Sequence, residues 1–337
     1  MPDVGAFIAG IEYALPERRI SNAELAAQHP TWRVEQTVPT TGVLERRWVE
    51  PGQTALDLAE TACRALFERN GFEPGDIDVL LFCTQSPDHP MPPNACLLQD
   101  RLSLPRSVAA LDYTLACSGF IYGLFLARAL VVSGSARHVL LVTSDTYSTW
   151  SHPDDRAPRV LFGDGAAATL ISAGRAGLGE IALATDGAGA STFMVSAGGA
   201  RRPRSAQTQV PCIDGSGNVR TEEHLYMNGA AVLDFVKREV PPLVCNLLAR
   251  AKLSMDDLDL VLLHQASRVT LDQLYRALKI PRSKRFENLE MIGNTVSASL
   301  PILLRDAETR GVLQRGMKVM LVGFGVGLSW GGCILEW

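Results

Sequence analysis

Cys117 is the residue whose surroundings most favour chemistry. It stands where a strand pattern over residues 108–113 gives way, through Ser118 and Gly119, to an apolar helical pattern over residues 121–132. A cysteine at such a turn lies near the amino end of a helix, where partial positive charge and free N–H groups lower the thiol pKa. The alternative is a buried, inert cysteine. The turn favours the interpretation that Cys117 is a nucleophile.

Two polar residues in the second half of the chain are further candidates. His264 ends a buried strand pattern, and ligands of open α/β sheets bind at the carboxyl ends of strands. Taken alone, it fits a satisfied core histidine equally well. Asn294 lies in a glycine–asparagine turn before a small-residue helix, and by itself it is more simply interpreted as a plain loop residue.

Residues 323–332 (GFGVGLSWGG) form a glycine-dense stretch that we interpret as a turn between two strands. Glycines there let backbone N–H groups approach a ligand closely. A phosphate-binding loop is the rival interpretation. It is weak, because no Lys-Ser/Thr pair follows and no GxGxxG motif opens a helix.

The elements that position these residues are predicted from an internal repeat. Short runs rich in Val and Leu alternate with helical patterns, which is typical of α/β folds with buried central strands. When the two copies of the repeat are matched, His264 of the second copy aligns with Cys83 of the first, so the repeat itself does not require a histidine at this position. We predict two duplicated halves, 1–173 and 174–337, with connecting loops at 187–199 and 201–217 near the join. The matched segments are 76–86 with 257–267, 137–142 with 317–322, and 162–165 with 324–327.

Composition limits the classes of function. The chain has 337 residues, of which 47% are hydrophobic and 20% charged, with a net charge of −4. These values predict a soluble protein without general affinity for nucleic acid or anionic membranes. We see no secretory signal and no apolar stretch near the roughly 18 residues of a membrane span. The basic stretch 201–204 is interpreted as a solvated loop. Seven cysteines without CxxC spacing predict reduced thiols in the cytoplasm and no zinc site.

Five motifs occur in order along the chain: ACSGF around Cys117, FGDGAA at 162–167, HQA at 264–266, GNT at 293–295 and FGVGLSWG at 324–331. Together they resemble the β-ketoacyl-acyl-carrier-protein synthase III family, whose order and spacing they follow over essentially the whole chain. The resemblance implies an α/β, thiolase-like, duplicated five-layer α/β/α/β/α fold and a homodimer.

The resemblance also implies roles for the residues. Cys117 takes the acyl group, and the N–H groups of Cys117 and Val326 form an oxyanion hole, although the family usually has glycine at position 326. His264 and Asn294 donate hydrogen bonds to a malonyl thioester as carbon dioxide leaves. Acyl-CoA or acyl-carrier protein serves as substrate, with a carrier protein as partner and no separate cofactor. The implied substrate-binding residues are Met91, Arg156, Gly229, Ser267, Phe324 and Gly325.

The chain departs from the family at the coenzyme A clamp. Gln36 and Thr40 stand where the family has Trp and Arg, and Val269 replaces a further arginine. Ser267 changes the family's HQAN to HQAS. Arg156 is retained, whereas Trp32 is four residues from the expected place. We therefore expect weaker binding of coenzyme A, with another carrier protein or a specialised acyl group as donor.

Met91 stands where the family places a residue that lines the acyl pocket across the dimer. Some head-to-head condensing enzymes have glutamate there, so Met91 argues against that class. Acyl transfer to oxygen or nitrogen remains an alternative, although Asn294 is retained. A silent partner subunit is another, although the nucleophile is present. A degradative thiolase is disfavoured, because Cys333 is followed by Ile-Leu and not by a CxG setting.

Overall fold

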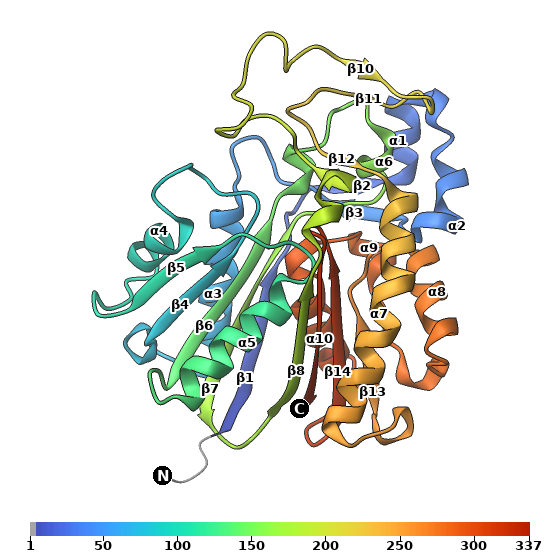
Figure 1. Ribbon diagram of the computed structural model, residues 1–337. Coiled ribbons are helices and arrows are strands. Elements are labelled where there is room, and N and C mark those ends of the chain that lie inside the picture. Colours follow the sequence, from blue (N-terminus) through green and yellow to red (C-terminus); the bar gives the residue numbers. More distant parts are fainter. Residues whose placement is uncertain (1–4) are drawn as a thin grey trace.

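Two β-sheets form the centre of the protein in the computed structural model, which describes residues 5–337 (Figure 1). The first sheet has the strand order β1-β7-β6-β4-β5 and the second β13-β14-β15-β8. The strands of the first sheet are β1 (Gly5–Ala14), β4 (Val79–Cys83), β5 (Ala109–Tyr113), β6 (His138–Asp145) and β7 (Gly165–Gly174). Those of the second are β8 (Leu178–Thr185), β13 (Leu260–Leu263), β14 (Lys318–Gly325) and β15 (Ser329–Glu336).

The two sheets repeat one pairing pattern. In the first, β1 and β6 both pair antiparallel with β7, and β6 pairs parallel with β4. In the second, β8 and β14 both pair antiparallel with β15, and β14 pairs parallel with β13. Two of the matched sequence segments fall on β4 and β13 and on β6 and β14. The division at residues 173 and 174 stays a prediction.

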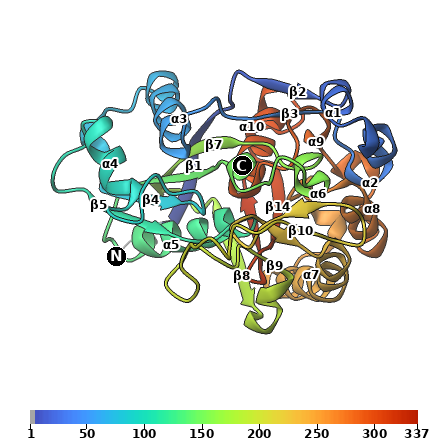
Figure 2. The same ribbon diagram turned by 90° about the horizontal axis from the view of Figure 1, so that it is seen from above.

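Helices lie between the sheets and on both outer faces, so the predicted five layers are confirmed (Figure 2). One pair covers the outside of the first sheet, one pair lies between the sheets, and α7 packs on the second sheet with α8 against it. One apolar core lies on the outer face of each sheet, and a third surrounds the helices between the two sheets. These helices are α3 (Ala55–Asn70) and α4 (Asn94–Arg101), α5 (Gly119–Val132) and α10 (Ser299–Thr309), and α7 (Gly229–Ala251) and α8 (Arg268–Ala277).

Local sequence explains where these elements begin and end. Every residue of β4 and of β13 is buried, as expected for central strands covered by helices on both faces. Thr54 and Asp57 form a capping box at the start of α3, and Gly71 ends the helix at φ 67°. The side chain of Asn228 accepts a hydrogen bond from the N–H of Ala231 and so caps α7.

Short elements lie above the carboxyl ends of the central strands (Figure 1). The predicted loops 187–199 and 201–217 lie after β8, in the connection to α7. One strand, β8, lies between them and the predicted division at residues 173 and 174. Residues 201–204 are exposed, as predicted. The short elements are β2 (Arg19–Ser21), α1 (Asn22–Gln28), α2 (Val38–Thr41), β3 (Glu45–Arg47), α6 (Arg156–Arg159), β9 (Phe193–Met194), β10 (Cys212–Ile213), β11 (Val219–Arg220), β12 (Tyr226–Met227) and α9 (Leu289–Ile292).

Across residues 5–337, no helix combines the length and the apolar character that crossing a bilayer requires.

Candidate active site

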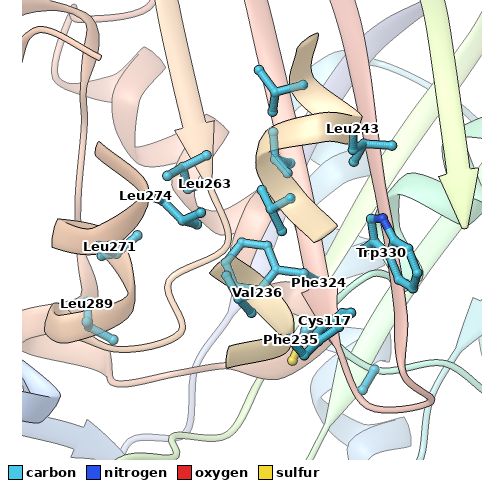
Figure 3. Packing of buried hydrophobic residues seen from close by; sticks show 14 of the residues in the cluster. Cys117, Phe235, Val236, Leu243, Leu263, Leu271, Leu274, Leu289, Phe324 and Trp330 are labelled. Atoms are coloured by element: carbon cyan, nitrogen blue, oxygen red, sulfur yellow. The ribbon is translucent and has the colours of Figure 1, made fainter. Parts of the chain in front are cut away.

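Cys117, His264 and Asn294 line one small cavity of about 80 Å³, which we call the thiol chamber. Cys117 follows β5 and precedes α5, His264 directly follows β13, and Asn294 lies between α9 and α10. The structure therefore brings together three candidates that come from separate strand and turn ends. Figure 3 shows Cys117 beside Phe235, within a cluster of buried apolar side chains.

The turn that carries Cys117 accepts hydrogen bonds from the residues that end β4 and β5. The thiol of Cys83 donates to the carbonyl of Leu115 at 3.1 Å, and the hydroxyl of Tyr113 donates to the carbonyl of Gly119 at 2.9 Å. A Cβ atom on Gly119 would lie 2.4 Å from the Cys83 sulfur, so only glycine fits there. Cys83 and Tyr113 thus position the turn that carries Cys117. Nothing in the local sequence indicated this role.

The environment of the Cys117 thiol differs from the prediction. The side chain is buried, and this burial raises its pKa. The negative charge of Asp145 raises the pKa further, and the hydrogen bond from the cysteine's own N–H only partly offsets these effects. The predicted lowering of this pKa is therefore wrong, because burial is the largest influence on the thiol. The free protein carries a neutral thiol.

The glycine-dense stretch is the hairpin between β14 and β15, as predicted, and it packs directly on Cys117. A Cβ atom on Gly325 would lie 2.9 Å from Cβ and 3.0 Å from Sγ of Cys117. Among residues 5–337, the N–H groups of Cys117 and Val326 have no hydrogen-bond acceptor in another residue. The hydroxyl of Ser329 donates to the Val326 carbonyl at 2.8 Å and lies 2.7 Å from the Ser118 hydroxyl. These bonds tie the hairpin to the start of α5.

His264 is fixed by the sheet and by an aromatic ring. The backbone N–H of His264 donates to the carbonyl of Val322 at 2.9 Å, which extends the pairing of β13 with β14. The imidazole meets the Phe324 ring edge to face, with centroids 5.5 Å apart. Within residues 5–337 its buried Nδ1 atom has no hydrogen-bond partner. Burial lowers the pKa of His264 to about 3, so the ring is neutral at physiological pH.

The amide of Asn294 is oriented by backbone groups. Its oxygen accepts from the N–H of Val296 at 2.9 Å, and its nitrogen donates to the carbonyl of Ala266 at 3.3 Å. An amide nitrogen has two hydrogens, so one remains for a ligand. The backbone of Asn294 also pairs with Leu161 and Gly163, through bonds of 2.9 and 3.0 Å. The FGDG motif of the first half therefore positions the GNT motif of the second.

The carboxyl group of Asp145 accepts hydrogen bonds from residues in both halves of the chain. It ends β6 and accepts hydrogen bonds from the N–H of Gln85 at 2.8 Å and from the N–H of Ser297 at 3.3 Å. The hydroxyl of Ser297 donates to the same carboxyl group. Burial raises the pKa of Asp145 to about 7. Sequence analysis missed this residue, because its partner lies in the other half of the chain.

A second cavity of about 610 Å³, the access cavity, adjoins the thiol chamber. Five residues line both: Leu161, Met227, Gly229, Ser267 and Thr270. Trp32, Arg33 and Arg156 line the access cavity, as do the family-departure residues Gln36, Thr40 and Val269.

The substrate-binding candidates therefore separate into four groups. Gly229 and Ser267 line both cavities, whereas Arg156 lines the access cavity alone. Phe324 and Gly325 line the thiol chamber with Cys117. Met91 is 81% exposed and lines neither cavity of its own chain. In the part of the chain that the structure describes, no three His, Cys, Asp or Glu residues are grouped as metal ligands.

Comparisons with known proteins agree with this geometry. The family model described as 3-oxoacyl-[acyl-carrier-protein] synthase III matches residues 111–199, and its C-terminal counterpart matches residues 248–337. A β-ketoacyl-[acyl-carrier-protein] synthase III from a Roseiflexus species is 36% identical over 98% of both chains.

Two solved structures extend the likeness. A 3-oxoacyl-(acyl-carrier-protein) synthase III is 46% identical with a TM-score of 0.97, covering 99% of this chain and 100% of its own. The priming β-ketosynthase of a polyketide pathway is 29% identical with a TM-score of 0.86, covering 98% and 96%.

Proposed function

This chain belongs to the 3-oxoacyl-[acyl-carrier-protein] synthase III family, and on that premise we propose that it acylates Cys117 from an acyl thioester and condenses the acyl group with a malonyl thioester. One observation carries the proposal: a thiol, a neutral imidazole and an oriented amide line the same 80 Å³ chamber. The enzyme is then an acyltransferase of fatty acid or polyketide-type biosynthesis.

The first half-reaction forms the acyl-enzyme. The Cys117 sulfur bonds to the acyl carbon, the donor's carbon–sulfur bond breaks, and the thiol proton leaves with the donor thiol. Free N–H groups on Cys117 and Val326 support an oxyanion hole for the negative oxygen of the tetrahedral intermediate. Because the thiol is neutral in the free protein, its proton must be removed as the donor binds.

The second half-reaction forms the carbon–carbon bond. The malonyl carboxylate leaves as carbon dioxide, and the electron pair of the broken bond becomes an enolate of the thioester. The enolate carbon attacks the acyl carbon on Cys117 and expels the thiolate. Neutral His264 and the free hydrogen of the Asn294 amide are suited to donate hydrogen bonds to the enolate oxygen. The reaction needs no cofactor besides its substrates.

The access cavity is the proposed route for the donor's pantetheine arm. It leads into the thiol chamber and is lined by Trp32, Arg33 and Arg156, with the Arg156 guanidinium donating to the Trp32 carbonyl at 3.2 Å. The Trp32 ring is buried and stacks on His29 with centroids 3.8 Å apart, so the nucleotide of coenzyme A meets little free aromatic surface. This supports a carrier-protein donor.

A second copy of the chain is the proposed partner on the side of β5. This strand is at the edge of its sheet, and exposed edges readily pair with another chain. Large apolar side chains are exposed nearby on β5 and α5, with Leu111 at 44% and Phe125 at 45%. The exposure of Met91 fits a role in the pocket of the other protomer.

We place the protein in the cytoplasm, since none of the seven cysteines is in a disulfide.

The test is a reconstituted reaction with purified protein, an acyl-pantetheine donor and malonyl-carrier protein. Cys117 should gain the acyl mass, and a 3-oxoacyl-carrier protein and carbon dioxide should form in equal amounts. Cys117→Ala should abolish loading, whereas replacing the exposed Cys245 should not. An acyl-enzyme that gives neither a 3-oxoacyl product nor carbon dioxide would refute condensation, and an ester or amide formed once an alcohol or amine acceptor is added would support acyl transfer.

A further inference from the structure

Arg46 lies on β3 and is among the largest side chains that the fold buries completely. Within residues 5–337 its guanidinium forms no ion pair with a carboxylate, and the neighbouring Glu45 pairs instead with Arg19 and Arg47 at 3.6 and 3.7 Å. Burial lowers the pKa of Arg46 to about 10, so the group is still charged at neutral pH. A buried charge is costly unless hydrogen bonds satisfy it, so displacing the atoms that accept from Arg46 is unfavourable.

Three oxygen atoms from separate parts of the chain accept hydrogen bonds from Arg46. Its Nη1 atom donates to the carbonyl of Ile20 at 3.2 Å, and Nη2 donates to the side chain of Asn22 and the carbonyl of Val160, both at 2.8 Å. Ile20 is on β2, Asn22 begins α1, and Val160 follows α6. Arg46 therefore joins the amino-terminal elements to the stretch that leads into the FGDG motif.

Residues 160–164, which we call the bridging segment, lie between Arg46 and Asn294. On one side, Arg46 and Nε1 of Trp48 donate to alternate carbonyls of the segment, and the Trp48 bond to Phe162 is 3.0 Å long. On the other side, the backbone N–H of Asn294 donates to the segment at 2.9 Å, and its carbonyl accepts from the segment at 3.0 Å. Phe162 and Asn294 form a parallel β-bridge. A shift of the segment away from Arg46 and Trp48 would therefore move the backbone of Asn294 as well.

The turn before Asn294 also packs directly on Arg46. β3 and α9 lie side by side (Figures 1 and 2). Gly293 follows α9 and precedes Asn294, and a Cβ atom on it would lie 2.8 Å from the carbonyl of Leu161 and 3.2 Å from Cβ of Arg46. Arg46 thus holds this turn by packing as well as through the bridging segment.

Resting on the proposed function, we propose that Arg46 and Trp48 are positioning residues that hold the Asn294 amide in place for condensation. Neither residue lines the thiol chamber or the access cavity of the described chain, so both act through the bridging segment. Loading uses Cys117 and the N–H of Val326, which lie on the turn before α5 and on the hairpin between β14 and β15. Within residues 5–337 neither of these elements is hydrogen-bonded to Arg46 or Trp48. Changes at the two residues should therefore separate the half-reactions.

The experiment measures two saturated rates by intact mass: acylation of Cys117 by acyl-pantetheine, and transfer of the acyl group from isolated acyl-enzyme to malonyl-carrier protein. Arg46→Met keeps a long, unbranched side chain but donates no hydrogen bond. Since a misplacement of about 1 Å can cost about 10²-fold in rate, condensation should slow by at least about tenfold and loading by less than about threefold. Equal slowing of both rates, or wild-type condensation in the folded variant, overturns the proposal.

Trp48→Phe removes one donor to the bridging segment and tests the proposal even if Arg46→Met does not fold. The phenyl ring keeps an aromatic face beside Arg159, whose guanidinium carbon lies 4.1 Å from the centroid of the Trp48 ring. Condensation should again slow more than loading. An unchanged ratio of the two rates in this variant contradicts the role of the bridging segment.

Arg47→Met is the matched control, because the Arg47 side chain donates to the carbonyls of Pro16 and Glu17 and, within residues 5–337, not to the bridging segment. Its two rates should keep the wild-type ratio, and a fall as large as that of Arg46→Met overturns the proposal. Hydrogen–deuterium exchange over residues 289–298 should be faster in Arg46→Met and Trp48→Phe than in the control, and equal exchange overturns the proposal. If the wild-type acyl-enzyme does not condense, the proposed function fails, and exchange alone decides whether the turn is held from β3.

Discussion

Replacing Gly325 with alanine should disable the nucleophile while leaving the fold intact. The added Cβ would lie 2.9 Å from Cβ and 3.0 Å from Sγ of Cys117, inside van der Waals contact. The Cys117 Cβ is held by the turn before α5, and Gly325 is held in β14, so neither backbone can retreat freely. The thiol must rotate away. Such overpacking costs about 1–3 kcal/mol, and a misplacement of about 1 Å can cost about 10²-fold in rate.

The assay is the rate of Cys117 acylation, followed by intact mass beside a thermal melt. We expect Gly325→Ala to lower kcat/KM for loading by about 10²-fold or more while the protein still melts cooperatively. Gly75→Ala is the control, because no atom lies within 4 Å of its added Cβ. Loading of Gly325→Ala at the wild-type rate would refute the packing of the hairpin against the thiol.

Three more predictions follow from the site. His264→Ala and Asn294→Ala should each slow condensation by about 10²–10³-fold, and more than they slow loading; equal losses in both half-reactions would contradict enolate stabilisation. Because burial raises the Cys117 pKa, its alkylation by iodoacetamide should keep accelerating from pH 7 to pH 10, and a plateau below pH 8 would show that the thiol ionises readily. Burial raises the pKa of Asp145 to about 7, so between about pH 4 and 7 the native state holds a proton that the unfolded chain has released. The unfolding free energy should therefore fall as the pH rises from about 4 to about 7. Asp145→Asn should make the unfolding free energy, measured by denaturation at a series of pH values, depend less steeply on pH. An unchanged slope of unfolding free energy against pH would contradict this role of Asp145.

Local patterns indicated the candidate catalytic residues because each lies at the end of a strand or in a glycine turn. The order of β4, β6 and β7 recurs in β13, β14 and β15, and this repetition was visible as matched segments. The ends of these strands then place Cys117 and His264 in one chamber.

The supporting residues could not be predicted, because their roles depend on contacts across the fold. Ser297 reaches Asp145 from 152 positions away, and no local pattern links the two. The thiol pKa was mispredicted for a similar reason. The sequence around Cys117 indicates a helix terminus, whereas its burial comes from Phe235, Phe324 and other side chains distant in sequence.

The central claim is that Cys117 carries an acyl group that is transferred to carbon. Its most direct test is a single turnover, in which acyl-enzyme freed of donor is mixed with malonyl-carrier protein and both proteins are weighed by intact mass. We predict that Cys117 returns to its unmodified mass at the rate at which the carrier protein gains the acyl group and loses carbon dioxide. An acyl-enzyme that persists, or that only hydrolyses while malonyl-carrier protein stays unchanged, would contradict the account.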